Sequence, residues 1–384
     1  MTSARRLYVV VASVAALLVL IYATRQLDSP DAIEIAAPTL IPAEVPLAEA
    51  TATHQADFPA ADLRSALADV CSNAANDSAD NELTQEEIQA QIEAFNQLRL
   101  DLSDRLAVSA SAEHIHLAAL LENDSDTRVE LLERAISGSP SEPFIIWSAV
   151  RVCSDSAVSL DCPLRDWEQR LIAVDTQNSE SWIRIAANRY AAGETDAALE
   201  AMRHAATAAE TRIYWTETVE MIERGLAAAG SEYPFPERAG MAFGFAAMML
   251  PVYGDYTRMC VEQSPQSAEW AYTCLAYGEL AENQSKTDIG VSIGRSMQKL
   301  ALEALGEMEK AADVEKRLQH RRQERLNANI EHTVLTERLM TANPSMFTAF
   351  LAATRSVGEV AARRKIVAEI DRLLEQQPEL ACEP

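Results

Sequence analysis

The chain has 384 residues, a formal net charge of −25 and 48% hydrophobic residues. It is long enough to bury a large core, and its acidic balance predicts repulsion from nucleic-acid phosphates and from anionic lipid head groups. Nucleic acid is therefore excluded as an expected partner.

The N-terminal residues predict a membrane anchor. Residues 7–24 form an uncharged apolar run of the length that a helix needs to cross a bilayer. Arg5 and Arg6 precede the run and only Arg25 follows it directly, so the positive-inside rule places residues 1–6 in the cytoplasm. We expect a single-pass protein of the inner (cytoplasmic) membrane with a periplasmic or otherwise extracytoplasmic body. A cleaved signal peptide is the alternative.

Residues 25–62 predict a disordered tether, because they contain five prolines, many alanines and little periodicity. Random-coil scaling gives the tether a reach of roughly 30 to 35 Å, which keeps the body near the membrane. Beyond the tether we expect a helical repeat region over residues 63–230 and a C-terminal helical module over residues 231–384.

Six cysteines in a chain expected outside the cytoplasm make disulfides possible. Short spacing suits a bond between Cys153 and Cys162 and another between Cys260 and Cys274, each closing a corner between helices. By elimination, the third expected disulfide joins the two remaining cysteines, Cys71 and Cys382. Other connectivities stay open, and six buried free thiols are the alternative.

The pattern of the body predicts an all-α fold, since glycine is scarce and Ala, Leu and Glu recur at three- and four-residue spacing. One helix begins clearly after Thr84, which forms a capping box with Glu87, and its apolar face extends to position 106. We expect this helix to pack in the body; a coiled-coil dimer is the alternative. Further helices are expected over residues 240–250, 268–282, 293–326, 345–354 and 357–376.

The segment 240–250 is apolar on all sides and too short to span a membrane, which predicts a buried core helix. A site for an apolar ligand, formed by its methionines, is the alternative.

An internal period of about 34 residues, the length of a helix-turn-helix repeat, runs through the middle of the chain. Tryptophans recur 35 and 33 residues apart, and alanines recur 38 and 32 residues apart. These positions are Trp147, Trp182 and Trp215, and Ala135, Ala173 and Ala205.

The clearest unit opens a helix at Trp182, breaks it at Gly193 and continues with a second helix that includes Met202. This unit resembles a tetratricopeptide repeat, although Arg189 stands where the family has an aromatic residue and Glu210 where it has a proline. The resemblance covers approximately residues 112–225 and implies stacked hairpins with a groove for a peptide or protein segment. An irregular helical array is the alternative.

No motif for phosphate binding, nucleophilic catalysis or zinc binding occurs in the sequence, so we expect no cofactor and no metal. His114 and His116 are two residues apart, and on a helix they point in opposite directions. A basic cluster is interpreted either as a docking patch for an anionic partner or as the solvated end of a helix. Its residues are Lys316, Arg317, Arg321, Arg322 and Arg325.

These features together predict a membrane-tethered extracytoplasmic scaffold for protein interaction, with cell-envelope assembly among the roles open to it. The expected partner is a protein or peptide rather than a small molecule. The alternative is an enzyme or small-ligand receptor with its site in the C-terminal helical module. A deep pocket with converging polar groups would favour that alternative.

Overall fold

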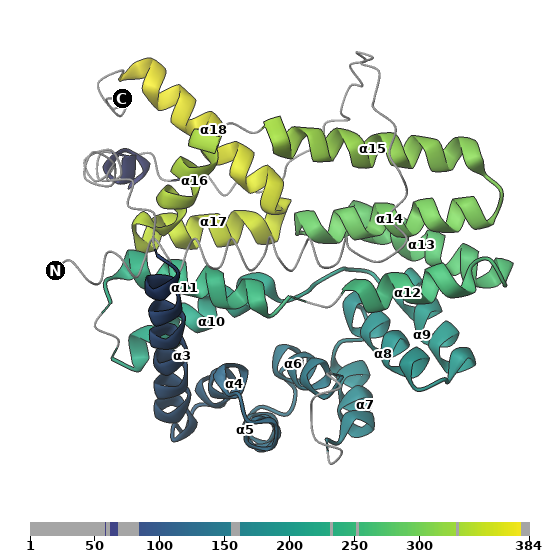
Figure 1. The fold of residues 1–384 in the computed structure, drawn as a ribbon, viewed down its shortest axis with the longest axis horizontal. Coiled ribbons are helices and arrows are strands. Elements are labelled where there is room, and N and C mark those ends of the chain that lie inside the picture. Colours follow the sequence, from purple (N-terminus) through teal and green to yellow (C-terminus); the bar gives the residue numbers. More distant parts are fainter. Residues whose placement is uncertain are drawn as a thin grey trace.

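The computed structural model describes residues 58, 62–67, 84–154, 162–230, 233–250, 253–327 and 330–377. Within these ranges the chain folds into helices and contains no strand, which confirms the expected all-α class (Figure 1). The predicted anchor, most of the predicted tether, and both Cys71 and Cys382 lie outside the described residues. None of the helices within the described ranges combines the length with the apolar composition that a bilayer span requires.

The helices form a body in which α3 to α9 lie along one side and α13 to α18 along the other, with α10 to α12 between them (Figure 1). The first group comprises α3 (Gln85–Ala107), α4 (Ala112–Leu121), α5 (Ser125–Gly138), α6 (Pro143–Cys153), α7 (Leu164–Val174), α8 (Ser179–Ala191) and α9 (Thr195–Thr207). The middle group comprises α10 (Trp215–Ala228), α11 (Phe235–Met248) and α12 (Tyr253–Gln263). The last group comprises α13 (Ala268–Gln284), α14 (Asp288–Ala304), α15 (Met308–Asn327), α16 (Ile330–Ala342), α17 (Pro344–Val357) and α18 (Glu359–Gln376).

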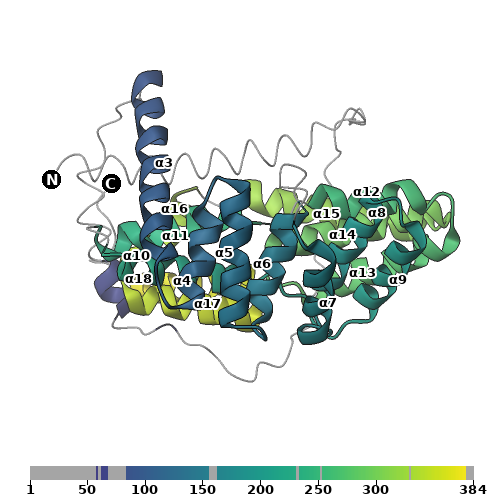
Figure 2. The ribbon, with the colours of Figure 1, turned by 90° about the horizontal axis from the view of Figure 1, so that it is seen from below.

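Helix α3 begins with the expected capping box, in which Thr84 and Glu87 bond reciprocally. Its C-terminal half is buried at Leu102 and Leu106, and the ring of Phe95 stacks on that of Phe245 with centroids 4.7 Å apart. The other end of the helix projects from the body (Figure 2). Burial therefore fixes α3 at its C-terminal end.

Helix hairpins recur along the chain. The pairs α4–α5, α6–α7, α8–α9 and α10–α11 each pack together, and their first helices begin 31, 36 and 36 residues apart. Gly193, with φ of 77°, turns the chain between α8 and α9. Helix α9 packs next against α13, whereas α10 packs back against α4. The last hairpin therefore turns towards the first and does not extend the line of hairpins.

The prediction of a single helix over residues 293–326 is wrong, because the chain reverses between α14 and α15. Gly306 has φ of 76°, a left-handed conformation that glycine adopts without a steric penalty. The N–H of Glu307 donates to the carbonyl of Leu302 at 2.9 Å and completes the end of α14. The apolar periodicity continues on both sides of this turn, which is why the pattern suggested one helix.

Two main hydrophobic cores hold the body together. One gathers side chains from α3 to α7, α10, α11 and α16 to α18, and the other from α8, α9 and α12 to α14. Both cores therefore combine residues from before and after position 230. Met241, Ala242 and Phe245 of α11 are buried in the first core, as the expected core helix requires.

Candidate functional site

The tryptophans and alanines of the internal period do not share one environment. Trp147, Ala135 and Ala205 are buried, and Trp182 stacks on His204 with ring centroids 4.3 Å apart. Trp215 is the partly buried first residue of α10. The period thus coincides with packing at most of its positions.

Ala173 is exposed and does not pack where helices cross. The buried side of α7 carries Trp167 and Leu171, which are four residues apart and so lie on one face of the helix. Ala173 follows Leu171 by two residues and lies on the opposite side. The alanine spacing alone therefore did not identify the packing position of this helix.

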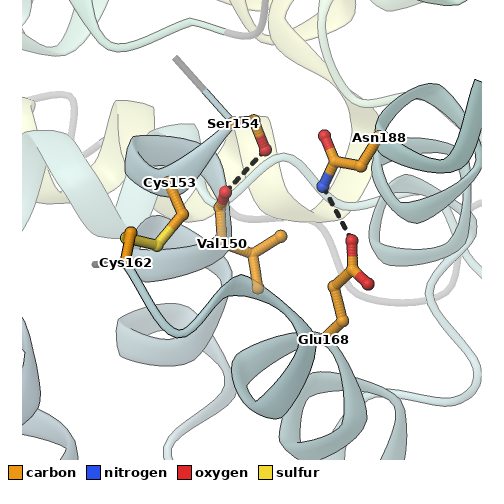
Figure 3. Close-up of a disulfide and its surroundings, with 6 residues drawn as sticks. All are labelled: Val150, Cys153, Ser154, Cys162, Glu168 and Asn188. Atoms are coloured by element: carbon orange, nitrogen blue, oxygen red, sulfur yellow. Dashed lines mark hydrogen bonds between the residues drawn. A yellow bond between two sulfur atoms is a disulfide. The ribbon is translucent and has the colours of Figure 1, made fainter. Parts of the chain in front are cut away.

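The structure brings together the two cysteine pairs expected from spacing, of which Figure 3 shows the pair Cys153 and Cys162. Cys153 at the end of α6 bonds Cys162 before α7, with Cα atoms 5.7 Å apart. Cys260 of α12 bonds Cys274 of α13, with Cα atoms 6.0 Å apart. Each disulfide closes a corner between consecutive helices.

A buried carboxylate joins α7 to α8 beside the first disulfide. Glu168 is 1% exposed and accepts a hydrogen bond from Asn188 at 3.0 Å (Figure 3). It also accepts from Arg189 at 2.8 Å. Arg165 donates to the same carboxylate at 3.0 Å. The sequence shows Glu168 only as one acidic residue among many.

The basic cluster on α15 is largely neutralised by carboxylates of the fold. Lys316 pairs with Asp313 at 3.2 Å. Arg317 pairs with Glu282 at 3.0 Å, and Arg321 pairs with Asp288 at 2.9 Å. Arg322 is exposed, and the side chain of Arg325 lies outside the described part of the structure. The charge that this surface offers to an external anion is therefore smaller than the sequence suggests.

His116 is a neutral core residue. It is fully buried, its two ring nitrogens have no hydrogen-bond partner among the described residues, and it meets the ring of Phe144 edge-on. Burial lowers the pKa of His116 to about 3, and the nearby charge of Arg151 acts in the same direction.

His114 instead lies within hydrogen-bond distance of the Ser109 hydroxyl, at 3.0 Å. Among the described residues, no group of three His, Cys, Asp or Glu side chains is placed to hold a metal ion.

Hydrogen bonds connect the loop before α8 to the loop before α10. The side chain of Asn178 donates to the carbonyl of Arg212 and accepts from its N–H, both at 2.9 Å. The hydroxyls of Ser179 and Thr211 are 2.9 Å apart, and the N–H of Ser179 donates to the carbonyl of Glu210 at 2.8 Å. Residues 210–212 are therefore fixed against the loop before α8, and they begin a wall formed by residues 210–217.

A cavity of about 510 Å³ lies beside this wall, between the start of α10, the turn joining α13 to α14, and the end of α17. Its lining includes the buried residues Thr211, Ile213, Tyr214, Thr216, Thr287 and Thr354. Its lining also includes the exposed residues Glu210, Arg212, Asn283, Lys286 and Arg355. We call these two sets the floor and the rim. The cavity thus has a recessed floor and a charged rim.

The rim cations are held in place by neighbouring groups. Arg212 pairs with Glu217, and Lys286 donates to the carbonyl of Ser356 at 3.0 Å. Arg355 donates to the hydroxyl of Thr216 at 3.1 Å and pairs with a carboxylate on α10, that of Glu220. The lining carries three cations and two carboxylates, Glu210 and Glu217, in a chain whose overall charge is −25.

The first turn of α10 faces this cavity without a side-chain cap. Its N-cap residue, Tyr214, has φ of 55° and makes no capping bond. The first N–H groups of a helix have no partner within the helix and carry the positive end of its dipole. The cavity thus combines this helix end with the rim cations.

No model of a known protein family matches the chain, and the search of curated proteins found no relative.

Proposed function

We propose that the protein is a membrane-tethered, extracytoplasmic interaction scaffold, whose helix hairpins resemble tetratricopeptide repeats and whose docking point is the cavity beside α10. The anchor over residues 7–24 and the extracytoplasmic placement belong to this proposal. The observation that supports it most is the position of the cavity, where the loops of the hairpins meet the C-terminal helices.

The cavity suits a short segment of a protein partner. Its floor is buried and partly apolar, so it admits a side chain or a chain end, while its rim supplies polar and charged groups around the entrance. Hydrogen bonds fix the wall at Arg212 and at Tyr214, so little ordering of the scaffold would accompany binding.

Site-specific photo-cross-linking in native membranes tests the proposal. The full-length chain would carry a photoactivatable residue either at Asn283, on the rim, or at Gln319, which is exposed on α15. We expect a defined protein adduct from position 283 and none from position 319. No adduct from position 283, or the same adducts from both positions, would exclude the cavity as the docking point.

A receptor for a small ligand is the second candidate, because the cavity volume of about 510 Å³ lies in the range of small-ligand sites. The alternative drawn from the sequence placed such a site at residues 240–250, but α11 packs its side chains into the core. Native mass spectrometry of the full chain, purified gently from its own membranes, tests this candidate. A mass that includes one small ligand per chain would support this candidate, and the mass of the chain alone would count against it.

A further inference from the structure

We infer that the cavity beside α10 binds an oxyanion, the carboxylate or phosphate group of its ligand, at the start of α10. This inference rests on the proposed function and deepens it, because it names the chemistry that the docking point recognises. Three observations of different kinds converge on it.

The first observation is the uncapped start of a 14-residue helix at the cavity wall. Tyr214, the N-cap residue, donates its phenol to Asp175 and gives α10 no side-chain cap. A negatively charged oxygen in the cavity would accept hydrogen bonds from the first N–H groups of the helix and would lie at the positive end of its dipole.

The second observation is an unused hydroxyl on the opposite side of the cavity. Thr354 of α17 lines the floor and is 1% exposed, and its side-chain oxygen has no hydrogen-bond partner within the described structure. A buried hydroxyl without a partner is unfavourable, so its presence points to a ligand atom that would complete the bond. Because a hydroxyl can donate, it suits an oxyanion.

The third observation is the charge of the rim. Among the described residues, the one acceptor that Lys286 bonds is the carbonyl of Ser356, which takes one of its three N–H groups and is uncharged. Two N–H groups of Lys286 therefore remain as donors for a ligand, and no described carboxylate pairs with it. Arg355 stands beside it in the lining, although a carboxylate of α10 offsets part of its charge.

Glu217 does not oppose an anion as strongly as its place in the lining suggests. Its carboxylate pairs with Arg212 at 3.1 Å and accepts from Thr216 at 2.9 Å. Glu210 remains as a charge on the rim, and its backbone is held by the loop before α8. Glu217 also lies in the first turn of α10 and accepts from its own backbone N–H, so it offsets part of the positive end of the helix. The remaining positive groups are thus Lys286 and the rest of the first turn of α10, and they act from two walls of the cavity.

Calorimetric titration of the full-length chain in detergent tests the inference, with inorganic phosphate and sodium acetate as probes and sodium chloride as the reference salt. We expect saturable binding of at least one oxyanion and none of chloride. Saturation by phosphate alone would assign the site to a phosphate group, and saturation by acetate alone to a carboxylate.

Three variants separate the site from general charge effects. Thr354→Val removes the unpartnered hydroxyl with little change of shape, and Lys286→Gln removes a rim charge; each should weaken oxyanion binding about tenfold. Lys316→Gln removes one exposed charge on α15 and should leave binding unchanged. Thermal unfolding of each variant would show that the fold is retained.

The inference is overturned if neither oxyanion binds saturably, or if Lys316→Gln weakens binding as much as Lys286→Gln does. Its failure is distinguishable from that of the proposed function. Oxyanion binding without a protein adduct at position 283 would leave the anion site standing and remove the scaffold role. An adduct at position 283 without oxyanion binding would support the scaffold role and exclude the anion site.

Discussion

The phenol of Tyr214 donates a hydrogen bond of 2.9 Å to the carboxylate of Asp175, 39 residues earlier in the chain. Both side chains are buried, and the same carboxylate accepts from Asn178 at 2.9 Å and from Ser181. Tyr214 is the one non-glycine residue with positive φ in the described ranges, and it stands at the start of α10. The bond therefore joins Asp175, at the end of α7, to the wall of the cavity.

Removing this phenol should destabilise the protein. Tyr214→Phe leaves the Asp175 carboxylate with one donor fewer, and we expect the free energy of unfolding to fall by about 1 to 2 kcal/mol. Chemical denaturation at neutral pH measures the change. Tyr272→Phe is the matched control, because Tyr272 is 59% exposed, and its effect should stay within about 0.5 kcal/mol. Equal effects of the two substitutions would show that the buried bond contributes nothing.

Local sequence patterns predicted those features that depend on neighbouring residues. The capping box at Thr84 and Glu87 needs only residues three positions apart, and the two cysteine pairs close short corners. The recurring hairpins also follow from local periodicity.

The cavity could not be predicted in this way. Its lining comes from residues 210–217, 283–287 and 354–355, which are brought together by packing between helices far apart in sequence. Within these segments the sequence singled out only Glu210 and Trp215, both as positions of the repeat and neither as part of a site. The left-handed backbone of Tyr214 gives no sequence signal either, since tyrosine is not a residue that favours positive φ.

The burial of His116 predicts a specific loss of stability in acid. Its pKa of about 3 in the folded protein lies below its ordinary value of 6.5, so the unfolded chain binds the proton more readily. The contribution of this group to stability is therefore complete above pH 6.5 and declines as the pH falls towards 3. Between pH 6.5 and 5 the loss should approach about 2 kcal/mol.

Comparison with His116→Leu isolates this effect, because other groups titrate alike in both proteins. The stability of the wild type relative to the variant should fall as the pH is lowered from 6.5 to 5, as measured by urea denaturation at each pH. His320→Gln, at an exposed position of α15, is the control and should follow the wild type. A constant difference between wild type and His116→Leu would contradict the prediction.

Helices α13 and α14 cross at a contact between two glycines. A Cβ atom added at Gly294 would lie 2.6 Å from the backbone nitrogen of Glu282 and 2.7 Å from the carbonyl oxygen of Gly278. Backbone atoms cannot move aside as a flexible side chain does, so Gly294→Ala should cost about 1 to 3 kcal/mol in spite of the higher helix propensity of alanine.

Gly138→Ala is the control for this substitution. At Gly138, in the last turn of α5, the nearest atom to an added Cβ is the methyl carbon of Ala112 at 3.2 Å. We expect a smaller effect on the midpoint of thermal unfolding there than at Gly294. A Gly294→Ala protein at least as stable as the wild type would mean that the two helices do not approach so closely.

The two disulfides should differ in accessibility to reductant. Cys260 and Cys274 are fully buried between α12 and α13, whereas Cys153 and Cys162 are partly exposed at the corner between α6 and α7. Reduction requires attack by a reductant on a sulfur atom, so a buried disulfide reacts only when the structure opens. Brief treatment of the native protein with a water-soluble phosphine, followed by alkylation and peptide mapping, should label Cys153 and Cys162 first. In urea all four cysteines should react at similar rates, and equal labelling of both pairs in the native protein would contradict the burial of the α12–α13 disulfide.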